Sequence, residues 1–316
     1  MQTVALARNA MATRFEIVLH GDNPTHLRAA AEEALDEVER IEAQLSLYQS
    51  SSEIAQINAR AAHAAVLVTP ELFRLLQRAQ QISSETNGAF DITIAPLLRA
   101  WKLMGDRGGV PDEQTLGAAR AKVGMRLVEL NEADRSVRFT REGVMLDLGS
   151  IGKGYALERA ASLLRESGIT SALLHGGTST VCAIGTQPDG QPWRIAIEHP
   201  ENQRASAPPS SQRHLATVPL RDESLSVSAV WGKFFAADGK IYGHVIDPRT
   251  GTPTQAAQLA AVVLPSATES DAFSTALLVS GSLDHDGIQK LRPEMRTLVY
   301  AEGKDGPQIV SRGMSL

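Results

Sequence analysis

The stretch SALLHGGTSTVCAIG, Ser171–Gly185, is a β-like run interrupted by Gly176 and Gly177. Two adjacent glycines inside such a run indicate a bulge or a close approach of another backbone segment. Similar short apolar runs follow it, separated by Gly, Pro, Asp and Asn: WRIAIEH (193–199), HLATVPL (214–220), SLSVSAV (224–230), KIYGHVI (240–246) and LAAVVLP (259–265). Together these runs predict a β-rich second half of the chain.

Helical patterns dominate the part of the chain before these runs. An alternating segment, Thr13–Gly21, predicts an opening strand. Apolar residues then recur every three or four positions from Thr25, again after the N-capping pair Thr69-Pro70, and from about Lys153 to Glu166, where Gly168 closes the helix. Because strands and helices do not alternate strictly, the pattern favours an α+β fold over a doubly wound sheet.

Composition limits the classes of protein that remain. The 316 residues, 43% hydrophobic and 21% charged, suit one globular domain or two intimately packed subdomains. A net charge of −5 argues against a surface that binds nucleic acid or anionic membranes, since both require a concentrated positive field. The single cysteine, Cys182, excludes an intramolecular disulfide and a thiolate metal cluster, and its apolar neighbours predict a buried, inert thiol.

The sequence contains no pattern typical of export or of membrane insertion. The N-terminal residues show neither a basic stretch followed by an apolar run nor a lipobox cysteine, so we expect a cytoplasmic protein, although a trimmed exported or lipoprotein form would look the same. The longest apolar runs, such as Leu259–Leu264, are far shorter than the roughly 20 residues of a membrane-spanning helix. The stretch 200–214 is rich in Pro, Ser, Ala and polar residues and predicts a mobile loop.

The segment LPSATESDAFSTALLVSG (264–281) predicts a helix with a polar site on it. Ser266 and Glu269 fit a capping box, and apolar residues follow at helical spacing. Asp271 and Thr275 lie four residues apart on one helical face, so their oxygens can converge. A carboxylate with a hydroxyl is a partial ligand set for Mg²⁺. The alternative is an aspartate stabilised by the helix dipole, with a threonine that is merely tolerated.

The segment VMLDLGSIGKGYALERA (144–160) combines a predicted buried strand, Val144–Leu148, with a glycine-rich turn into a helix. Glycines around Lys153 allow main-chain groups to face a ligand, and the lysine ammonium can approach a phosphate. The spacing matches neither a Walker A loop nor a Rossmann turn. Ordinary turn chemistry therefore remains an equal alternative.

The segment YGHVIDPRTGTP (242–253) places His244 two residues before the end of a predicted strand and Arg249 in the turn that follows. An imidazole there could act as a base near neutral pH, or it could be a satisfied, half-buried side chain. Arg249 could contact a ligand, or it could pair with Asp247 at the start of the turn.

The order of these segments along one chain resembles the ApbE family of flavin transferases, which act as FAD:protein FMN transferases. The resemblance covers about Met11 to Gly281 and is most specific at the G-S-I-G-K-G loop, the H-V-I-D-P-R-T-G turn and the S-D-A-x-S-T-A helix. The further matching segments are NAMATRFEIVLHG, LSLYQSSSEIAQIN, TNGAFDITIAPLLRAW, LLHGGTSTVCAIG and SVSAVWGKFF. This chain departs from the family at Thr178, where an acidic or amide residue is usual, and at SVSAVW, where T-S-G is usual.

The resemblance implies a fold and an activity. The fold is α+β and T-fold-related, a single ApbE-type domain over 1–316 in which a β-rich core and packed helices enclose a flavin cleft. The activity is Mg²⁺-dependent transfer of FMN from FAD to a threonine hydroxyl of a partner flavoprotein, with release of AMP. The acceptor motif is Asp/Ser-Gly-Ala/Ser-Thr-Ser/Thr. The alternatives are an Mg²⁺-dependent FAD pyrophosphatase that yields FMN and AMP, and a non-catalytic FAD-binding protein.

The resemblance also assigns roles to residues. It implies Mg²⁺ binding by the side chains of Asp271 and Thr275 and by the main-chain carbonyl of Ser150, and it implies His244 as the general base. Residues expected to contact the flavin nucleotide are Met11, Tyr48, Asn58, Phe90, Asp91, Lys153, Gly177, Ser228 and Arg249.

Overall fold

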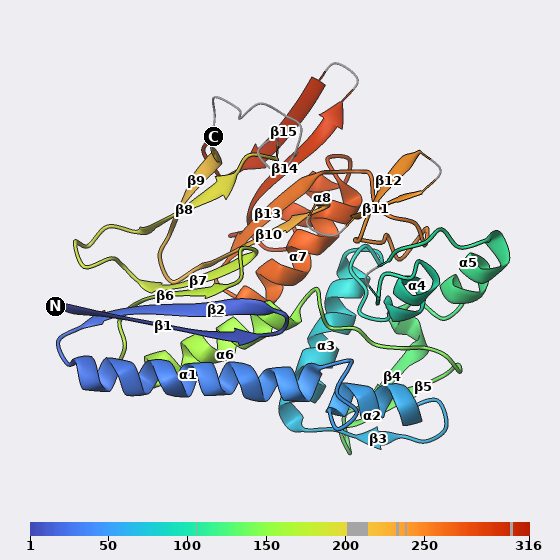
Figure 1. Cartoon of the computed structure of the whole chain (residues 1–316), viewed down its shortest axis with the longest axis horizontal. Helices are drawn as coiled ribbons and strands as arrows, with labels where there is room; N and C mark the ends of the chain where they lie inside the picture. Colours follow the sequence, from blue (N-terminus) through green and yellow to red (C-terminus); the bar gives the residue numbers. More distant parts are fainter. Residues whose placement is uncertain (106, 201–213, 232–233, 238, 304–305) are drawn as a thin grey trace.

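An eight-stranded antiparallel sheet forms the centre of the part of the chain that the structure describes (Figure 1). The structure, a computed structural model, describes residues 1–316 except 106, 201–213, 232–233, 238 and 304–305. The strands lie in the order β1 (Gln2–Ala10), β2 (Thr13–Gly21), β6 (Ser171–Gly176), β7 (Thr180–Gly185), β10 (Ser224–Ala229), β13 (Leu259–Leu264), β14 (Arg296–Gly303) and β15 (Gly306–Arg312). The predicted opening strand and the predicted strands of the second half are confirmed.

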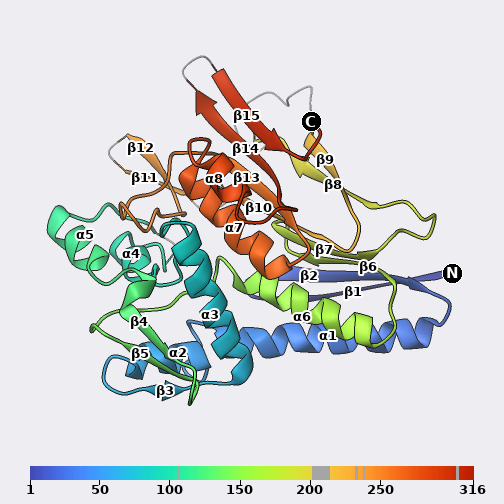
Figure 2. The ribbon, with the colours of Figure 1, turned by 180° about the vertical axis from the view of Figure 1, so that it is seen from behind.

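Three long helices cover one face of this sheet, as Figure 2 shows from behind. They are α1 (Pro24–Leu45), α6 (Gly152–Glu166) and α7 (Ala267–Ser280). The other face packs against a two-stranded sheet of β8 (Trp193–Glu198) and β9 (His214–Leu220), which forms a second hydrophobic core. Because both faces are covered, every residue of β13 is buried, which explains why this strand is continuously apolar. The α+β fold class is confirmed.

A smaller, mainly helical region packs beside α7 and carries its own short strands (Figure 1). Its elements are α2 (Glu53–Arg60), β3 (Val66–Leu67), α3 (Pro70–Glu85), α4 (Ala95–Ala100), α5 (Glu113–Arg120), η1 (Met125–Leu127), β4 (Val128–Asn131) and β5 (Ser136–Phe139). A hairpin of β11 (Phe234–Ala237) and β12 (Lys240–Gly243) lies next to α4 and α5, and α8 (His285–Gln289) follows α7.

Two expected local features differ in the structure. Pro70 begins α3 as predicted, but the Thr69 side chain does not cap the helix. Its hydroxyl accepts from the Gln44 amide at 2.8 Å and donates to the Glu53 carboxylate at 3.0 Å. Ser266 accepts the Glu269 N–H at 3.2 Å as a capping box requires. The reciprocal bond is missing because the Glu269 carboxylate pairs with Arg78 and Arg292.

The predicted strand Val144–Leu148 is buried but has no strand neighbour among the described residues. Its backbone is satisfied in another way. The Asn58 side chain accepts from the Leu146 N–H at 2.7 Å and donates to the Leu146 carbonyl at 3.0 Å, while the Asp147 N–H donates to the Ile92 carbonyl at 2.7 Å. Apolar burial was therefore predicted correctly, but strand pairing was not, because a side-chain amide replaces the neighbouring strand.

Three further predictions concern exposure and mobility. Cys182 is a free, fully packed thiol, and burial raises its pKa, in agreement with the predicted inert role. No helix within the described ranges is long and apolar enough to cross a membrane. The predicted mobile loop 200–214 falls, for residues 201–213, outside the described residues.

Candidate metal and flavin site

The start of α6 and the first half of α7 approach each other closely at Gly154. Its N–H donates to the Asp271 carboxylate at 2.9 Å. A Cβ atom at this position would lie 2.1 Å from the Ala267 carbonyl oxygen and 2.7 Å from the Asp271 Cβ, so no side chain fits. The glycine-rich turn therefore serves helix packing here, and this packing fixes the position of the Asp271 carboxylate.

Thr275 is the one residue of α7 that is not buried. The predicted apolar stripe is thus part of a helix that is enclosed on all sides by the sheet and its helical neighbours. Asp271 itself is only 4% exposed. Thr275 is therefore the position on α7 where a polar ligand can reach the helix, and it lies one turn after the buried Asp271 carboxylate.

Hydroxyl groups line the contact between α7 and the sheet. On β10, Ser226 is hydrogen-bonded to Ser270 at 3.0 Å, and Ser228 lies 3.3 Å from the Thr275 hydroxyl. On β7, the Thr180 hydroxyl donates to the second carboxylate oxygen of Asp271 at 3.4 Å. Ser228, a predicted flavin contact, is therefore brought next to the predicted metal ligand Thr275.

The glycine-rich loop adds a cation and a second carboxylate. The Lys153 ammonium lies 4.0 Å from the Asp271 carboxylate and donates to the Gly149 carbonyl at 3.2 Å. The Asp147 carboxylate accepts the Gly149 N–H at 2.8 Å. Burial raises the pKa of Asp147 above its ordinary value, while the Gly149 N–H and the Lys153 charge oppose this shift. Asp147 was absent from the predicted site; the signal for it was a lone carboxylate inside the apolar run Val144–Leu148.

The side chains that the structure places at this point of α7 fit Mg²⁺ in their chemistry. They offer oxygens, from the buried Asp271 carboxylate and from the Thr275 hydroxyl one turn later, and a role of the Ser150 carbonyl stays a prediction. No cluster of three or more His, Cys, Asp or Glu side chains suited to a metal occurs among the described residues. Mg²⁺ commonly takes one or two protein carboxylates and completes its shell with water and substrate phosphates. A single carboxylate therefore suits a magnesium ion that binds together with a phosphate-containing substrate.

His244 lies at a bend directly after β12 and is half-buried. The predicted strand thus ends at Gly243, earlier than expected, and only an isolated bridge between Ile246 and Pro253 follows. Gly243 packs against Val230, the residue directly after β10, because a Cβ on Gly243 would lie 3.1 Å from the Val230 carbonyl oxygen. Val230 comes two residues after Ser228, so the chain that carries His244 approaches the end of the hydroxyl-lined strand.

A second contact ties the same segment to α7. The Thr254 N–H donates to the Val245 carbonyl at 2.9 Å, and the Thr254 hydroxyl donates to the Val279 carbonyl at 3.4 Å. Val279 is one helical turn beyond Thr275. The residue after His244 is therefore anchored to the same stretch of α7 that carries the candidate metal ligands.

Arg249 pairs with Asp247, the alternative that the turn composition left open. Its Nε and Nη2 donate to the two carboxylate oxygens at 2.9 Å each, and Nη1 lies 4.0 Å from the Asp284 carboxylate. The hydrogen bond to Asp247 raises the pKa of the Arg249 guanidinium. The Nε and Nη2 groups of Arg249 are thus used within its own turn, and a flavin contact by Arg249 stays a prediction.

Two of the predicted flavin contacts meet at the turns of neighbouring hairpins. Met11 has a positive φ of 50° between β1 and β2, and its N–H donates to Glu42 at 2.7 Å. Gly177, with a φ of 66°, donates its N–H to the Arg14 carbonyl at 2.9 Å, and a Cβ there would lie 2.4 Å from the Thr13 hydroxyl. The two hairpin ends are therefore adjacent, and Gly177 is required by this close approach.

The remaining predicted contacts are not all directed toward a common ligand. Both the oxygen and the nitrogen of the Asn58 amide are hydrogen-bonded to the Leu146 backbone. The Phe90 side chain is completely buried, so only the main chain of Phe90 could reach a ligand. The buried Asp91 carboxylate accepts from the Thr93 N–H and hydroxyl at 2.8 and 2.6 Å. Tyr48, in contrast, is 75% exposed.

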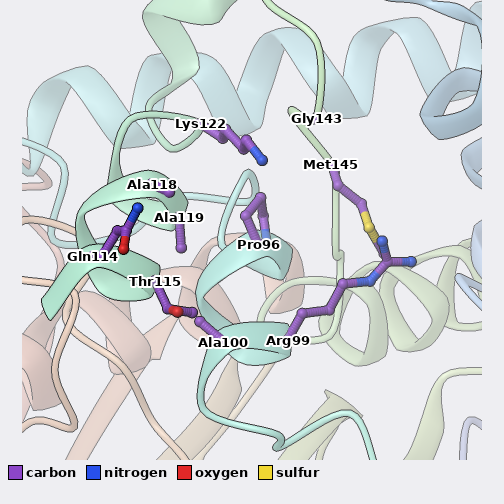
Figure 3. Close-up of a pocket in the computed structure, with 10 residues that line it drawn as sticks. All are labelled: Pro96, Arg99, Ala100, Gln114, Thr115, Ala118, Ala119, Lys122, Gly143 and Met145. Carbon is purple, nitrogen blue, oxygen red and sulfur yellow. The ribbon is translucent and has the colours of Figure 1, made fainter. Parts of the chain in front are cut away.

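A hollow of about 560 Å³ lies between α4, α5 and residues 143–145, and none of the predicted site residues lines it. Figure 3 shows Lys122 and Arg99 on different sides of Pro96 in this hollow. It is separate from the Asp271 contact and contributes no residue to the candidate site.

Comparisons with known proteins extend these observations. The sequence profile of the ApbE family matches residues 11–298. The FAD:protein FMN transferase of Klebsiella pneumoniae strain 342 is 30% identical over 287 residues, covering 89% of this chain and 77% of that protein. The crystal structure of the ApbE protein of Thermotoga maritima has a TM-score of 0.86 at 26% identity, covering 99% of this chain and 97% of that one. The apo flavinyl transferase ApbE of Pseudomonas stutzeri has a TM-score of 0.83 at 28% identity, with 99% and 95% covered.

Proposed function

Because the chain belongs to the ApbE family, we propose that it transfers FMN from FAD to a threonine hydroxyl of a partner flavoprotein and releases AMP. The observation that supports this most strongly is the placement of Asp271. Its carboxylate is buried, held by the Gly154 N–H, and one turn from Thr275, the single partly exposed residue of α7. This arrangement supports the binding of a hard cation beside a phosphate, as the cleavage of a pyrophosphate requires.

The side chains of Asp271 and Thr275 and the Ser150 carbonyl would hold Mg²⁺ together with the substrate's phosphates. When bound, the ion supplies neutralisation of the charge on the pyrophosphate. The Gly154 N–H keeps the Asp271 carboxylate in one orientation, and Lys153 places a positive charge within 4.0 Å of it. These residues position the dinucleotide, and positioning contributes much of the catalysis in phosphoryl-type transfer.

His244 acts on the acceptor. Its imidazole takes the proton of the threonine hydroxyl as the Oγ–P bond to the FMN phosphate forms. At the same time the bond between that phosphorus and the bridging oxygen of the pyrophosphate breaks, and the bridging oxygen leaves as part of AMP. A neutral imidazole is the side chain suited to this proton transfer near pH 7. Thr254 supports this role, because its N–H donates to the Val245 carbonyl and its hydroxyl donates to the Val279 carbonyl, which ties the residue next to His244 to α7.

The proposal is tested by incubating the protein with FAD, Mg²⁺ and an acceptor protein that contains Asp-Gly-Ala-Thr-Ser. Transfer yields in-gel flavin fluorescence on the acceptor and an equimolar amount of AMP. AMP release without labelling would show hydrolysis instead, and a yellow protein with neither product would show a binding protein only.

His244→Ala tests the base. This variant should bind FAD as the wild type does but transfer FMN on the order of 10²-fold more slowly, because the hydroxyl loses its proton acceptor. His63→Ala is the matched control, since His63 is 69% exposed and pairs with Glu142 in the helical region. Wild-type transfer by His244→Ala would reject the role of this residue.

A further inference from the structure

The β11–β12 hairpin presents an apolar face to solvent. Cross-strand pairing places Phe234 opposite Gly243 and Ala236 opposite Ile241, and paired residues share one face of a sheet. Phe234 and Ile241 are 67% and 72% exposed. We call the exposed residues of this face, Phe234, Ala236 and Ile241, the outer hairpin face.

The opposite face of the hairpin is anchored, so the chain itself does not bury the outer one. Phe235 and Tyr242 stack with ring centroids 5.2 Å apart, and Tyr242 lies 5.4 Å from Trp101. The Trp101 indole N–H donates to the Gly251 carbonyl at 2.7 Å. Phe235 also occupies the space over Gly108, where a Cβ would come within 2.7 Å of several of its atoms. This aromatic packing fixes which face of the hairpin points outward.

The outer hairpin face is continuous with the segment that carries the candidate base. β12 ends at Gly243, and His244 is the next residue. Leu283, which is 96% exposed, precedes Asp284, whose carboxylate lies 4.0 Å from Arg249 in the turn after His244. Exposed apolar side chains therefore border the 244–249 segment from the hairpin and from the turn between α7 and α8.

We propose that the outer hairpin face and Leu283 dock an apolar segment of the acceptor protein that flanks its target hydroxyl. This inference rests on the proposed function, because an FMN transferase must bring part of another polypeptide to His244. The residues on either side of the acceptor hydroxyl then necessarily pass over the surface next to His244. Exposed apolar side chains gain free energy when such a contact removes them from water, and clusters of them mark interaction surfaces.

Two peptides that both contain Asp-Gly-Ala-Thr-Ser separate this role from others. One carries leucine and valine on both sides of the motif, and the other carries serine there. The double variant Phe234→Ser/Ile241→Ser should raise the KM for the apolar peptide about tenfold or more, toward the wild-type KM for the serine peptide, with kcat and FAD affinity unchanged. Leu67→Ser is the matched control, because Leu67 is equally exposed, at 70%, but lies on β3.

Binding is measured separately from chemistry by fluorescence anisotropy of both peptides on the FAD-loaded protein. Weaker binding of the apolar peptide to the double variant supports docking even when no flavin is transferred, and in that case only the proposed function fails. Equal binding and equal KM in variant and wild type overturn the docking proposal. It is also overturned if the double variant loses FAD affinity, which would show a cover over the flavin, or changes a wild-type dimer into a monomer, which would show a contact with a second copy.

Discussion

Gly154→Ala is the sharpest test of how the candidate site is built. The added Cβ would lie 2.1 Å from the Ala267 carbonyl oxygen and 2.7 Å from the Asp271 Cβ, where ordinary contacts begin near 3.4 Å. Both neighbours belong to the backbone or first side-chain carbon of α7, so neither can rotate away. The two helices must separate by about 1 Å, and overpacking of this kind typically costs about 1–3 kcal/mol.

The same displacement disturbs the bond from the Gly154 N–H to the Asp271 carboxylate, now 2.9 Å long. Hydrogen bonds to charged groups contribute about 1.5–3 kcal/mol. We therefore expect the variant to lose roughly 3 kcal/mol of stability and to bind Mg²⁺ more weakly in the presence of FAD.

Thermal melting and calorimetric titration of Mg²⁺ measure the two effects. Gly152→Ala, two residues earlier in the same helix, is the control, because its Cβ would meet only a Leu45 methyl at 3.8 Å. This control should change stability by no more than about 1 kcal/mol. If both variants have the same melting temperature and the same affinity for Mg²⁺, the close approach of α6 and α7 does not position Asp271, and the reasoning is refuted.

Three further predictions concern the metal ligand, a predicted flavin contact and a buried histidine. Asp271→Asn keeps the size of the side chain but removes its charge, so Mg²⁺-dependent AMP release should be lost while the apo protein melts near the wild-type temperature; unchanged turnover would rule out Asp271 as a ligand. Asn58→Ala leaves the Leu146 N–H and carbonyl without partners, so the apo protein should lose about 1–3 kcal/mol of stability. A variant with normal apo stability but weakened FAD binding would instead show that Asn58 serves the flavin alone. Burial lowers the pKa of His285, whose Nε2 is 2.8 Å from the Thr297 hydroxyl, so the unfolded chain binds a proton more readily than the folded one. Stability should therefore fall as the pH drops below about 6.5, and chemical denaturation of His285→Gln from pH 7 to 5 should show a shallower fall than the wild type; parallel curves would exclude this contribution.

Sequence patterns predicted the elements whose signal is local. The alternation in Thr13–Gly21 and the helical spacing after Pro70 match β2 and α3 closely. Patterns missed the mostly buried strand β14, and they also failed at the edges of the sheet, where β1 and β15 were not predicted. Most of their residues are at least partly exposed, so the contrast between apolar and polar positions that marks a half-buried strand is weak there.

The sequence by itself determined the α+β composition, the four-residue spacing of Asp271 and Thr275, and the order of motifs that places the chain in its family. Only the tertiary structure decided that Gly154 holds Asp271 across 117 residues of sequence, that Asn58 replaces a strand beside Leu146, and that Arg249 closes its own turn. The physical reason is the range of the interactions. Helical and strand periodicity arise from neighbours within a few residues, whereas a carboxylate buried between two helices depends on how distant segments fill the same space.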